Sequence, residues 1–565
     1  MTMKKIRFLK LSPKVPKELI YSFIFCLLFY LIESWLLKFN YDQFEKLNTK
    51  EFRIPLMANL MLSTITFLFF VVGIWLTLLS KKLWKICFYI FICVSLIVEY
   101  SCKLSLNHFT TIYEWSIVGQ TNEDQKKDLL YLFLNPQSLF MIAFSIAFIK
   151  VFSVNKNQKY LNTIKFSYFS LMLFFYSLSY SYTSNMYITI SACAFIRSGI
   201  AFPCYVFKTE KYHKSPRKRI KYASKPQKTN QNIVFILDES VRGDHNNFYG
   251  YERLVTSKIL LEMKKQNKLI NWKECVSGAT ASFGSNLLLL TGLQNEYLPD
   301  TEMNTLMMPT LFQYAKAMGY KTYCLDGQMQ DYWNGKKDDL NYIDSRLGID
   351  SFIYRGNYYI DSLIAIKIKE IIKDTTSLHF IWVNKMGVHT AYERNYPKES
   401  EQWKPTKGYT RPTGDKNTDA LNRQMLINNY DNALSFNSRV FWNSLTNKNG
   451  NLDEKTVFIY TSDHGQTLSD KGEFWPHNSN SSKEASVPLW IINKPKQLQI
   501  DTNFLPHHSN ILPTLLDLMG FPDTERTFMY DKSLFKGTVK DNRPRQSWHG
   551  HLYRKTPGSG RVPFD

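Results

Sequence analysis

The sequence predicts a multi-pass α-helical membrane domain with five spans, followed by an α/β domain with a mostly parallel central sheet. Two observations lead to this fold class. The first part of the chain holds long apolar runs with almost no charge inside them, and roughly 20 apolar residues cross a bilayer as a helix. From Thr229 onward, short apolar strands alternate with helical stretches, as in α/β domains. At 565 residues the chain is also too long for one compact core.

Five apolar segments have the length of membrane spans. We place them near Leu19–Leu37, Pro55–Leu79, Leu83–Tyr100, Ser138–Val154 and Phe166–Tyr182. Buried core helices of a soluble protein are the alternative, which five such runs disfavour. Basic residues precede the first span and lie at the second–third and fourth–fifth junctions, so the positive-inside rule makes those sides cytoplasmic. An odd number of spans then exports the rest of the chain.

The apolar segment Tyr187–Phe207 is the main challenge to this topology. As a sixth span it would leave the large domain in the cytoplasm, but it carries Arg197 near its middle, a glycine and a proline. We therefore predict an interfacial helix on the outer membrane face, with the basic linker after it resting on anionic head groups. The predicted domains are 1–185 (membrane, with an exported loop at 104–136), 186–228 (interfacial helix and linker) and 229–565 (exported α/β domain).

Charge and cysteine content narrow the class of partner. Lys and Arg number 70 against 48 Asp and Glu, a net charge of +22, which suits a polyanion or an anionic membrane surface. Because of the membrane segments, we expect lipid head groups and no nucleic acid as the partner.

The eight cysteines show no CxxC and no zinc-finger spacing. Only Cys275 and Cys324 lie in the polar half, so at most one disulfide can form there.

Three predicted strands are followed by residues of the types that can bind metals or phosphate. The strands are Asn232–Leu237, Leu378–Val383 and Thr456–Tyr460. The polar residues that follow them are Glu239, His389, Asp463 and His464, with His477 a short loop further on. Ligands of open α/β sheets bind beyond the carboxyl ends of the strands, and carboxylates with imidazoles are typical of zinc sites. Each of these residues alone could have a structural role, such as a capping Asp or a hydrogen-bonded His. Because all of them follow strand ends at the same edge of the sheet, a metal site is favoured.

A segment of small and hydroxyl residues, Glu274–Thr291, offers a nucleophile. It passes into an apolar helical stretch, so that a hydroxyl would lie at a helix N-terminus, where backbone N–H groups favour a phosphate. Thr280, Ser277 and Ser282 are the candidates, and simple N-capping is the alternative role. A divalent cation nearby would lower the pKa of the hydroxyl.

These motifs together resemble the membrane-anchored phosphoethanolamine transferases of the alkaline phosphatase/sulfatase-like superfamily. The resemblance rests on Glu239-x-x-Arg242 with Gly250-Tyr251, on Gly278-Ala279-Thr280-Ala281 after Cys275, on Met386-Gly387-Val388-His389, and on Ser462-Asp463-His464-Gly465. His477 matches a second downstream histidine, and Gln120-Thr121-Asn122-Glu123 is a variant of the family's donor-lipid loop. The resemblance extends over nearly the whole chain.

The resemblance implies a sulfatase/alkaline-phosphatase-like α/β fold and a reaction. Glu239, Thr280, Asp463 and His464 would hold one zinc ion, with Thr280 as the nucleophile. His389 and His477 would bind the phosphoryl group or a second zinc ion, and Thr121, Asn122 and Glu123 would handle the donor lipid. Phosphatidylethanolamine would be the donor, and lipid A, the lipopolysaccharide core or another exported glycan the acceptor. The enzyme would then lie in a bacterial inner membrane, with its catalytic domain in the periplasm.

Four other functions are alternatives to this one. A sulfatase needs Cys or Ser in a Cys/Ser-x-Pro-x-Arg context, and neither partner follows Cys275. A glycerol-phosphate transferase that uses phosphatidylglycerol shares the five-span plan and the threonine nucleophile, so it remains the first alternative. A non-catalytic membrane scaffold is the second; it predicts no metal and no covalent intermediate. A transporter is disfavoured because the spans contain almost no ionisable residues.

The five-span topology predicts an exported C-terminus. A fluorescent reporter that matures only in the cytoplasm, fused after Asp565, is expected to stay dark, because five crossings carry it across the membrane. A bright fusion would show an even number of crossings, with 187–207 as a sixth span.

Overall fold

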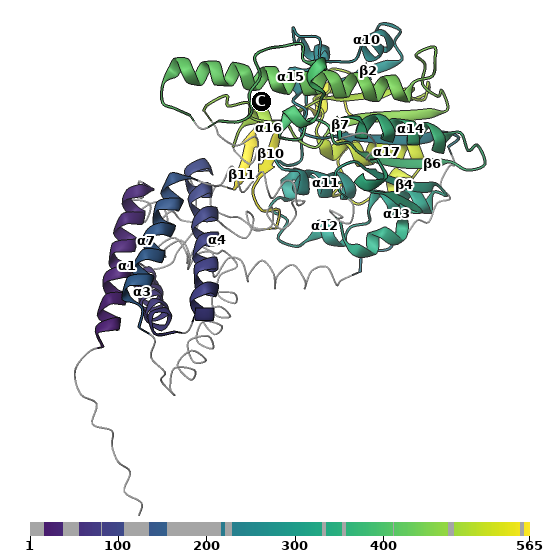
Figure 1. The fold of residues 1–565 in the computed structure, drawn as a ribbon. Helices are drawn as coiled ribbons and strands as arrows, with labels where there is room; N and C mark the ends of the chain where they lie inside the picture. Colours follow the sequence, from purple (N-terminus) through teal and green to yellow (C-terminus); the bar gives the residue numbers. More distant parts are fainter. Residues whose placement is uncertain are drawn as a thin grey trace, which may run out of the picture. The chain divides into compact units, whose positions relative to one another are not determined.

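The protein is described here by a computed structural model. It describes residues 16–37, 56–80, 82–106, 135–154, 216–220, 229–329, 335–352, 357–410, 412–472, 480–553 and 559–564. The chain divides into two compact units, 1–206 and 207–565. Each unit is built from its own kind of element, helices alone in the described part of the first and a sheet with helices in the second (Figure 1).

Apolar helices form the described part of the first unit (Figure 1). They are α1 Lys17–Leu36, α3 Leu56–Leu79, α4 Lys82–Leu106 and α7 Pro136–Phe152, close to the first four predicted spans. Two stretches, Lys17–Leu36 and Lys82–Leu104, are long and apolar enough to cross a membrane, whereas Phe67–Leu79 and Pro136–Phe152 are shorter apolar helices. The fifth predicted span, the interfacial segment 187–207 and residues 107–134 of the exported loop lie outside the described residues.

Helix α4 extends further than the sequence suggested. It continues to Leu106, whereas the predicted span ends at Tyr100. The reason lies in the burial of its polar residues: Glu99, Ser101 and Lys103 are all less than a tenth exposed. A helix whose polar side chains are covered by protein has no need to end where the apolar run ends.

The second unit is centred on a seven-stranded sheet of order β2-β9-β7-β1-β6-β4-β5. Its strands are β1 Asn232–Asp238, β2 Leu269–Asn271, β4 Lys321–Asp326, β5 Ser345–Leu347, β6 His379–Asn384, β7 Thr456–Ser462 and β9 Leu489–Ile492. Strands β7, β1, β6, β4 and β5 run parallel. At one edge β9 pairs antiparallel with β7, and β2 pairs antiparallel with β9, so β9 is the one described strand of this sheet that runs against the others. The mostly parallel sheet predicted from the sequence is confirmed.

Helices cover both faces of this sheet. Ile233, Phe235 and Leu237 of β1 belong to one buried core, which helices α11, α13 and α17 complete, and Val234 and Ile236 belong to a second core with α10, α14 and the end of α15. The helices are α10 Lys258–Lys265, α11 Ser282–Thr291, α12 Asn304–Met307, α13 Leu311–Ala317, α14 Ile360–Ile372, α15 Lys416–Leu445, α16 Ser482–Ala485 and α17 Ile511–Met519. Alternate residues of β1 therefore serve opposite cores, which is why its sequence is continuously apolar.

Two small antiparallel pairs lie beside the main sheet. They are β3 Cys275–Val276 with β8 Ser486–Val487, and β10 Gln546–His549 with β11 Gly560–Pro563. Cys275 on β3 and Cys324 on β4 are both buried free thiols, so no disulfide joins them. Burial raises the pKa of both thiols, which keeps them protonated and unreactive at neutral pH.

Register brings the three predicted strands together at one edge. Asp238 at the end of β1 pairs with Ser462 at the end of β7, and Leu237 pairs with Asn384 at the end of β6. The loop after β6 then folds onto the residue after β1, where the Val388 N–H donates to the carbonyl of Glu239 at 3.1 Å. The carboxyl ends of β7, β1 and β6 therefore open at one place.

This close approach depends on a glycine. Gly387 has a left-handed backbone with φ of 56°, and a Cβ there would lie 2.7 Å from the backbone N and 2.8 Å from the backbone O of Glu239. A side chain would both strain the backbone and push the loop away from Glu239.

Replacing this glycine is expected to destabilise the second unit. Gly387→Ala adds the clash with Glu239 to the cost of a left-handed alanine, about 1–2 kcal/mol. Gly450→Ala is a matched control, because Gly450 is also left-handed, with φ of 75°, but nothing lies within 4 Å of its Cβ position. Denaturant unfolding should show the larger loss for Gly387→Ala, by about 1 kcal/mol or more. Equal losses of unfolding free energy in the two variants would show that the loop moves away from Glu239 without an energetic penalty.

Candidate active site

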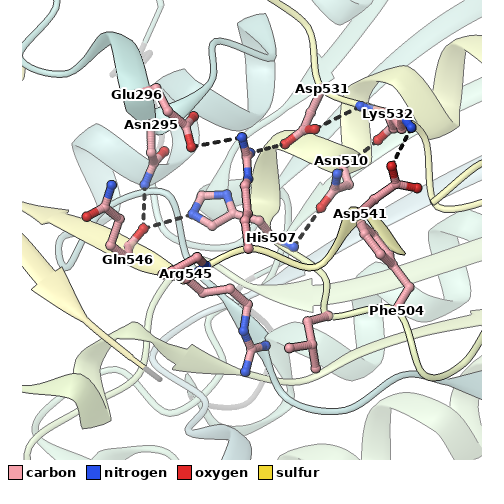
Figure 2. Close-up of a pocket in the computed structure, with 13 residues that line it drawn as sticks. Asn295, Glu296, Phe504, His507, Asn510, Asp531, Lys532, Asp541, Arg545 and Gln546 are labelled. Carbon is pink, nitrogen blue, oxygen red and sulfur yellow. Dashed lines mark hydrogen bonds and ion pairs between the residues drawn. The ribbon is translucent and has the colours of Figure 1, made fainter. Parts of the chain in front are cut away.

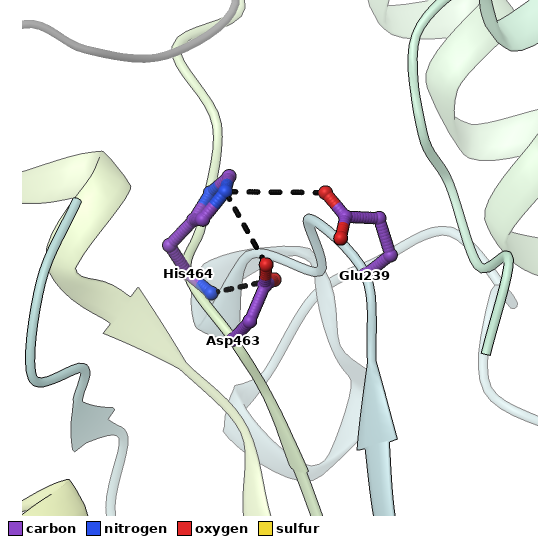
Figure 3. A group of neighbouring side chains, drawn as sticks. All are labelled: Glu239, Asp463 and His464. Atoms are coloured by element: carbon purple, nitrogen blue, oxygen red, sulfur yellow. Dashed lines mark hydrogen bonds and ion pairs between the residues drawn. The ribbon is translucent and has the colours of Figure 1, made fainter. Parts of the chain in front are cut away.

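Two carboxylates and an imidazole meet at the carboxyl edge of the sheet. Glu239 follows β1, and Asp463 and His464 follow β7; one ligand atom from each lies within 4.8 Å of the others, and all three residues are buried (Figure 3). The Nε2 atom of His464 is 3.4 Å from Asp463 Oδ2 and 3.9 Å from Glu239 Oε1. The structure thus brings together three of the residues that the sequence analysis placed at this edge.

Glu239 is fixed by a strained turn. Ser240, the next residue, is fully buried and left-handed with φ of 62°, a conformation that costs a non-glycine residue about 1–2 kcal/mol. In this conformation Ser240 Oγ donates to Glu239 Oε1 at 2.6 Å, and its backbone N–H donates to Asp463 Oδ1 at 3.0 Å. Tyr430 donates its hydroxyl to the Ser240 carbonyl at 2.9 Å. The strained turn therefore links the carboxylates of Glu239 and Asp463.

Hydrogen bonds also orient Asp463 and His464. Asp463 Oδ1 accepts the Ser240 N–H and the His464 N–H, whereas Oδ2 is buried and accepts no hydrogen bond within the described residues. On the imidazole, Nδ1 lies 2.6 Å from the Gly465 carbonyl and donates its proton there. This leaves the lone pair of Nε2 facing the two carboxylates, as in histidines that bind metals.

Burial alters the acidity of both carboxyl groups. It raises the pKa of Glu239. Burial and, next, the negative charge of Glu239 raise the pKa of Asp463 to about 7. Two carboxylates that share a dry site oppose each other's ionisation, and a cation between them removes that opposition.

The hydroxyl beside this cluster belongs to Ser282. Its Oγ lies 3.1 Å from His464 Nε2, to which it donates. Thr280, the sequence-predicted nucleophile, has its hydroxyl 3.1 Å from His549 Nδ1 on β10, and Ser277 donates to the Ala279 carbonyl at 2.9 Å. Of the three candidate hydroxyls, Ser282 alone has a hydrogen bond to a cluster residue among the contacts within the described chain.

Ser282 is also the first residue of helix α11. The residue before it, Ala281, is extended with φ of −145°, and no side chain within the described residues caps this end. The free backbone N–H groups and the helix dipole make the position favourable for an anion such as a phosphoryl group. Further along, Ser285 Oγ donates to the Asp463 carbonyl at 2.5 Å, which fastens α11 to the end of β7.

His508 is a supporting residue that the sequence analysis did not identify. Its Nδ1 accepts the Gly278 N–H at 3.1 Å, and its Nε2 lies 3.2 Å from Thr461 Oγ1. Burial lowers the pKa of His508 well below its ordinary value, so the ring is neutral and can accept at Nδ1. It joins the hydroxyl-rich segment to β7.

Gln328 is a second unpredicted neighbour. Its Nε2 donates to Glu239 Oε2 at 3.0 Å and to the Lys385 carbonyl at 2.7 Å. Gln328 lies two residues after β4, at the same carboxyl edge of the sheet. Reading the segment Lys321–Asp326 as a strand would have indicated it.

The other predicted site residues are placed as follows. His389 is half-buried at the end of the loop that bonds to Glu239 through Val388, and it is not part of the three-residue cluster. His477 and the donor-loop residues Thr121, Asn122 and Glu123 lie outside the described residues.

The residues present fit a zinc ion. Glu239, Asp463, His464 and Ser282 offer carboxylate, imidazole and hydroxyl ligands, a set of four as tetrahedral zinc requires. The Asp463 Oδ2 atom, buried without a hydrogen bond in the described structure, is the kind of group that a cation would satisfy.

A separate polar pocket lies between the turn at 295–296 and the segments 504–510 and 531–546 (Figure 2). Five of its charged side chains form ion pairs: Arg543 with Glu296 at 2.9 Å and with Asp531, and Lys532 with Asp541. Arg545, which also lines it, donates to the Glu274 carbonyl. None of the three cluster residues lines it.

Comparison with known proteins identifies the family. Residues 231–521 match the Sulfatase family. The chain belongs to the sulfatase family. The match covers the sheet and every cluster residue, from the start of β1 to the segment after α17.

Relatives of this sulfatase-family protein include named transferases. The chain is 23% identical over 299 residues to the Kdo(2)-lipid A phosphoethanolamine 7''-transferase of Escherichia coli (strain K12), covering 51% of this chain and 49% of that protein. It is 24% identical over 304 residues to the phosphatidylethanolamine transferase Mcr-2 of Escherichia coli, covering 51% and 53%. The chain therefore spans about half the length of these curated relatives.

One solved structure shares the fold over most of the chain. The integral membrane protein lipooligosaccharide phosphoethanolamine transferase A (EptA) from Neisseria meningitidis matches with a TM-score of 0.58 and 17% identity, covering 91% of this chain and 96% of that one. The likeness extends over both units of this sulfatase-family protein, so their combination in one chain is a shared architecture.

The raised pKa of Asp463 predicts how the metal-free protein responds to pH. Between about pH 4 and 7 the folded state holds a proton that the unfolded chain has released, so the free energy of unfolding falls as pH rises through this window. The loss is a few kcal/mol, at about 1.4 kcal/mol per pKa unit. Thermal unfolding of the chelator-treated protein should show this slope, and Asp463→Asn, which cannot titrate at this position, should reduce it; the raised pKa of Glu239 contributes a slope of the same sign that remains. An unchanged slope in the variant would assign it to other groups.

Proposed function

We propose that the protein is a zinc-dependent phosphoethanolamine transferase that works through a covalent serine intermediate. The observation that carries the proposal is the meeting of Glu239, Asp463 and His464 with the Ser282 hydroxyl at the N-terminus of α11. Two carboxylates and an imidazole make a cation site, and a hydroxyl within hydrogen-bonding distance is a nucleophile in need of activation. The transferase names of the curated relatives support the same activity.

Zinc, when bound by these residues, would lower the pKa of the hydroxyl and neutralise charge on the phosphoryl oxygens. The chain's own groups do the rest. The start of α11 offers backbone N–H groups to the phosphoryl oxygens. By the family resemblance, His389 and His477 would bind the same group or a second zinc ion. The Gly465 carbonyl holds the proton of His464 Nδ1, so that Nε2 remains a ligand.

The reaction proceeds in two displacements. The Ser282 oxygen attacks phosphorus of phosphatidylethanolamine, the bond from phosphorus to the diacylglycerol oxygen breaks, and the serine proton ends on diacylglycerol. An acceptor hydroxyl then attacks the phosphoserine, and its proton returns to the Ser282 oxygen. The nucleophile is assigned to Ser282 instead of the sequence-predicted Thr280 because the Thr280 hydroxyl contacts His549 and the Ser282 hydroxyl contacts His464.

The cellular setting follows from the donor. We infer a bacterial inner membrane protein with a five-span domain at 1–185, an interfacial helix and basic linker at 186–228, and a catalytic domain at 229–565 in the periplasm. Thr121, Asn122 and Glu123 would take part in donor binding. The acceptor would be lipid A, the lipopolysaccharide core or another exported glycan, as the name of one relative suggests.

A pair of variants tests the nucleophile. After incubation with phosphatidylethanolamine vesicles, intact-mass analysis should find a phosphoethanolamine adduct on the wild-type protein and on Thr280→Val, which keeps the shape of threonine. Ser282→Ala should carry no adduct, because its alanine has no oxygen to attack phosphorus. The reverse pattern would return the nucleophile to Thr280.

The donor and the metal are tested with the same measurement. Phosphatidylglycerol vesicles should give no adduct, and a glycerol-phosphate adduct would favour the alternative transferase instead. Removal of zinc with a chelator should abolish the adduct, and added zinc should restore it. A protein that binds no zinc and forms no adduct with either lipid would support a non-catalytic scaffold.

A further inference from the structure

A buried triad of charges lies directly behind the candidate metal centre. Lys385, the residue after β6, forms an ion pair with Asp238 at the end of β1 and lies 3.5 Å from Asp361 in the first turn of α14. The three side chains are between 0% and 4% exposed. The Lys385 ammonium also lies 4.8 Å from the centre of the Phe441 ring. No part of the proposed reaction uses these groups.

Each carboxylate of the triad holds backbone of the active site. Asp238 Oδ1 accepts the Glu239 N–H at 3.0 Å, while its Oδ2 accepts the Tyr460 hydroxyl at 2.6 Å. Asp361 accepts the N–H groups of Met386 at 2.8 Å and Gly387 at 3.2 Å. One carboxylate thus fixes the residue that carries a metal ligand, and the other fixes the loop that packs on it and leads to His389.

Lys385 links the two carboxylates, Asp238 and Asp361, through its charge. Its ammonium lies between the two carboxylates, and its own backbone N–H donates to the Leu237 carbonyl at 2.9 Å while its carbonyl accepts from Gln328. Buried ion groups seldom add stability over apolar residues of similar size, so stability alone does not account for three charges here. Their shared feature is contact with the backbone at the end of β1, which carries Glu239, or with that of the loop that packs on Glu239.

We propose that Lys385, with Asp238 and Asp361, is a positioning device that sets the geometry of the metal centre through Glu239 and the Met386–His389 loop. The triad touches neither substrate nor metal in this proposal and acts only through the groups that it holds. The inference rests on the proposed function in one respect, that the cluster of Glu239, Asp463 and His464 binds zinc.

Zinc affinity tests the proposal. Lys385→Met keeps the length of the side chain but leaves Asp238 and Asp361 facing each other without a counter-charge, so the backbone that they hold should move. The apparent zinc affinity of the full-length protein in detergent, measured by competition with a chromophoric chelator, should fall about 10- to 100-fold, as is typical when outer-shell partners of metal ligands are lost. Asp361→Asn, which keeps the Lys385–Asp238 pair and the fold, should weaken zinc binding about 10-fold through the loop alone.

Arg217→Met is the matched control. Arg217 and Asp339 form another buried ion pair in the same unit, 3% and 1% exposed, without contact to the cluster residues in the described structure. The control should lose thermal stability yet bind zinc within about twofold of wild type.

Two results would overturn the proposal: wild-type zinc affinity in both Lys385→Met and Asp361→Asn, or an equal loss of zinc affinity in the Arg217→Met control. If Lys385→Met fails to fold, the zinc affinity of Asp361→Asn decides whether the proposal stands. If the wild-type protein itself shows no zinc affinity, that result would instead contradict the proposed function.

Discussion

The structure depends most on the burial of two carboxylates, those of Glu239 and Asp463, at the place where parallel strands end. Their ligand atoms lie within 4.8 Å of one another and of a ring nitrogen of His464, and none of the three residues is more than 1% exposed. Such a pair is unfavourable unless a proton or a cation lies between its members, which is why the pKa of Asp463 rises to about 7. The proposed cation would remove this repulsion, and it would also satisfy Asp463 Oδ2, which accepts no hydrogen bond within the described residues.

The fold explains why these groups can be brought so close. Strands β7, β1 and β6 are neighbours in one parallel sheet, so their carboxyl ends coincide, and continuous apolar sequence keeps them between two layers of helices. The left-handed Ser240 bends the chain directly after Glu239, and the left-handed Gly387 lets the loop after β6 pack closely on the Glu239 backbone. The strained turn at Ser240, the glycine at 387 and the charged triad all help to hold the Glu239 carboxylate in one orientation.

Much of this was available in the sequence, and some of it was not. The three central strands and the polar residues after them are readable because parallel strands are apolar throughout and end abruptly in charged residues. The choice between Thr280 and Ser282 was not readable, since it depends on where α11 begins and on the extended Ala281 before it. His508, Gln328 and Lys385 come from elements without a distinctive pattern, and their roles arise only from packing. Helix α4 ran past its apolar limit because its polar residues are buried.

The central claim is that one cation joins the ends of two strands to the start of one helix. Anomalous diffraction at the zinc absorption edge, from crystals of the full-length protein grown without chelator, tests it most directly. The account predicts a single strong peak within ligand distance of Glu239, Asp463, His464 and the Ser282 oxygen, with any second peak beside His389. A map with no peak among the first three side chains, or with the ion held by Thr280 and not Ser282, would contradict it.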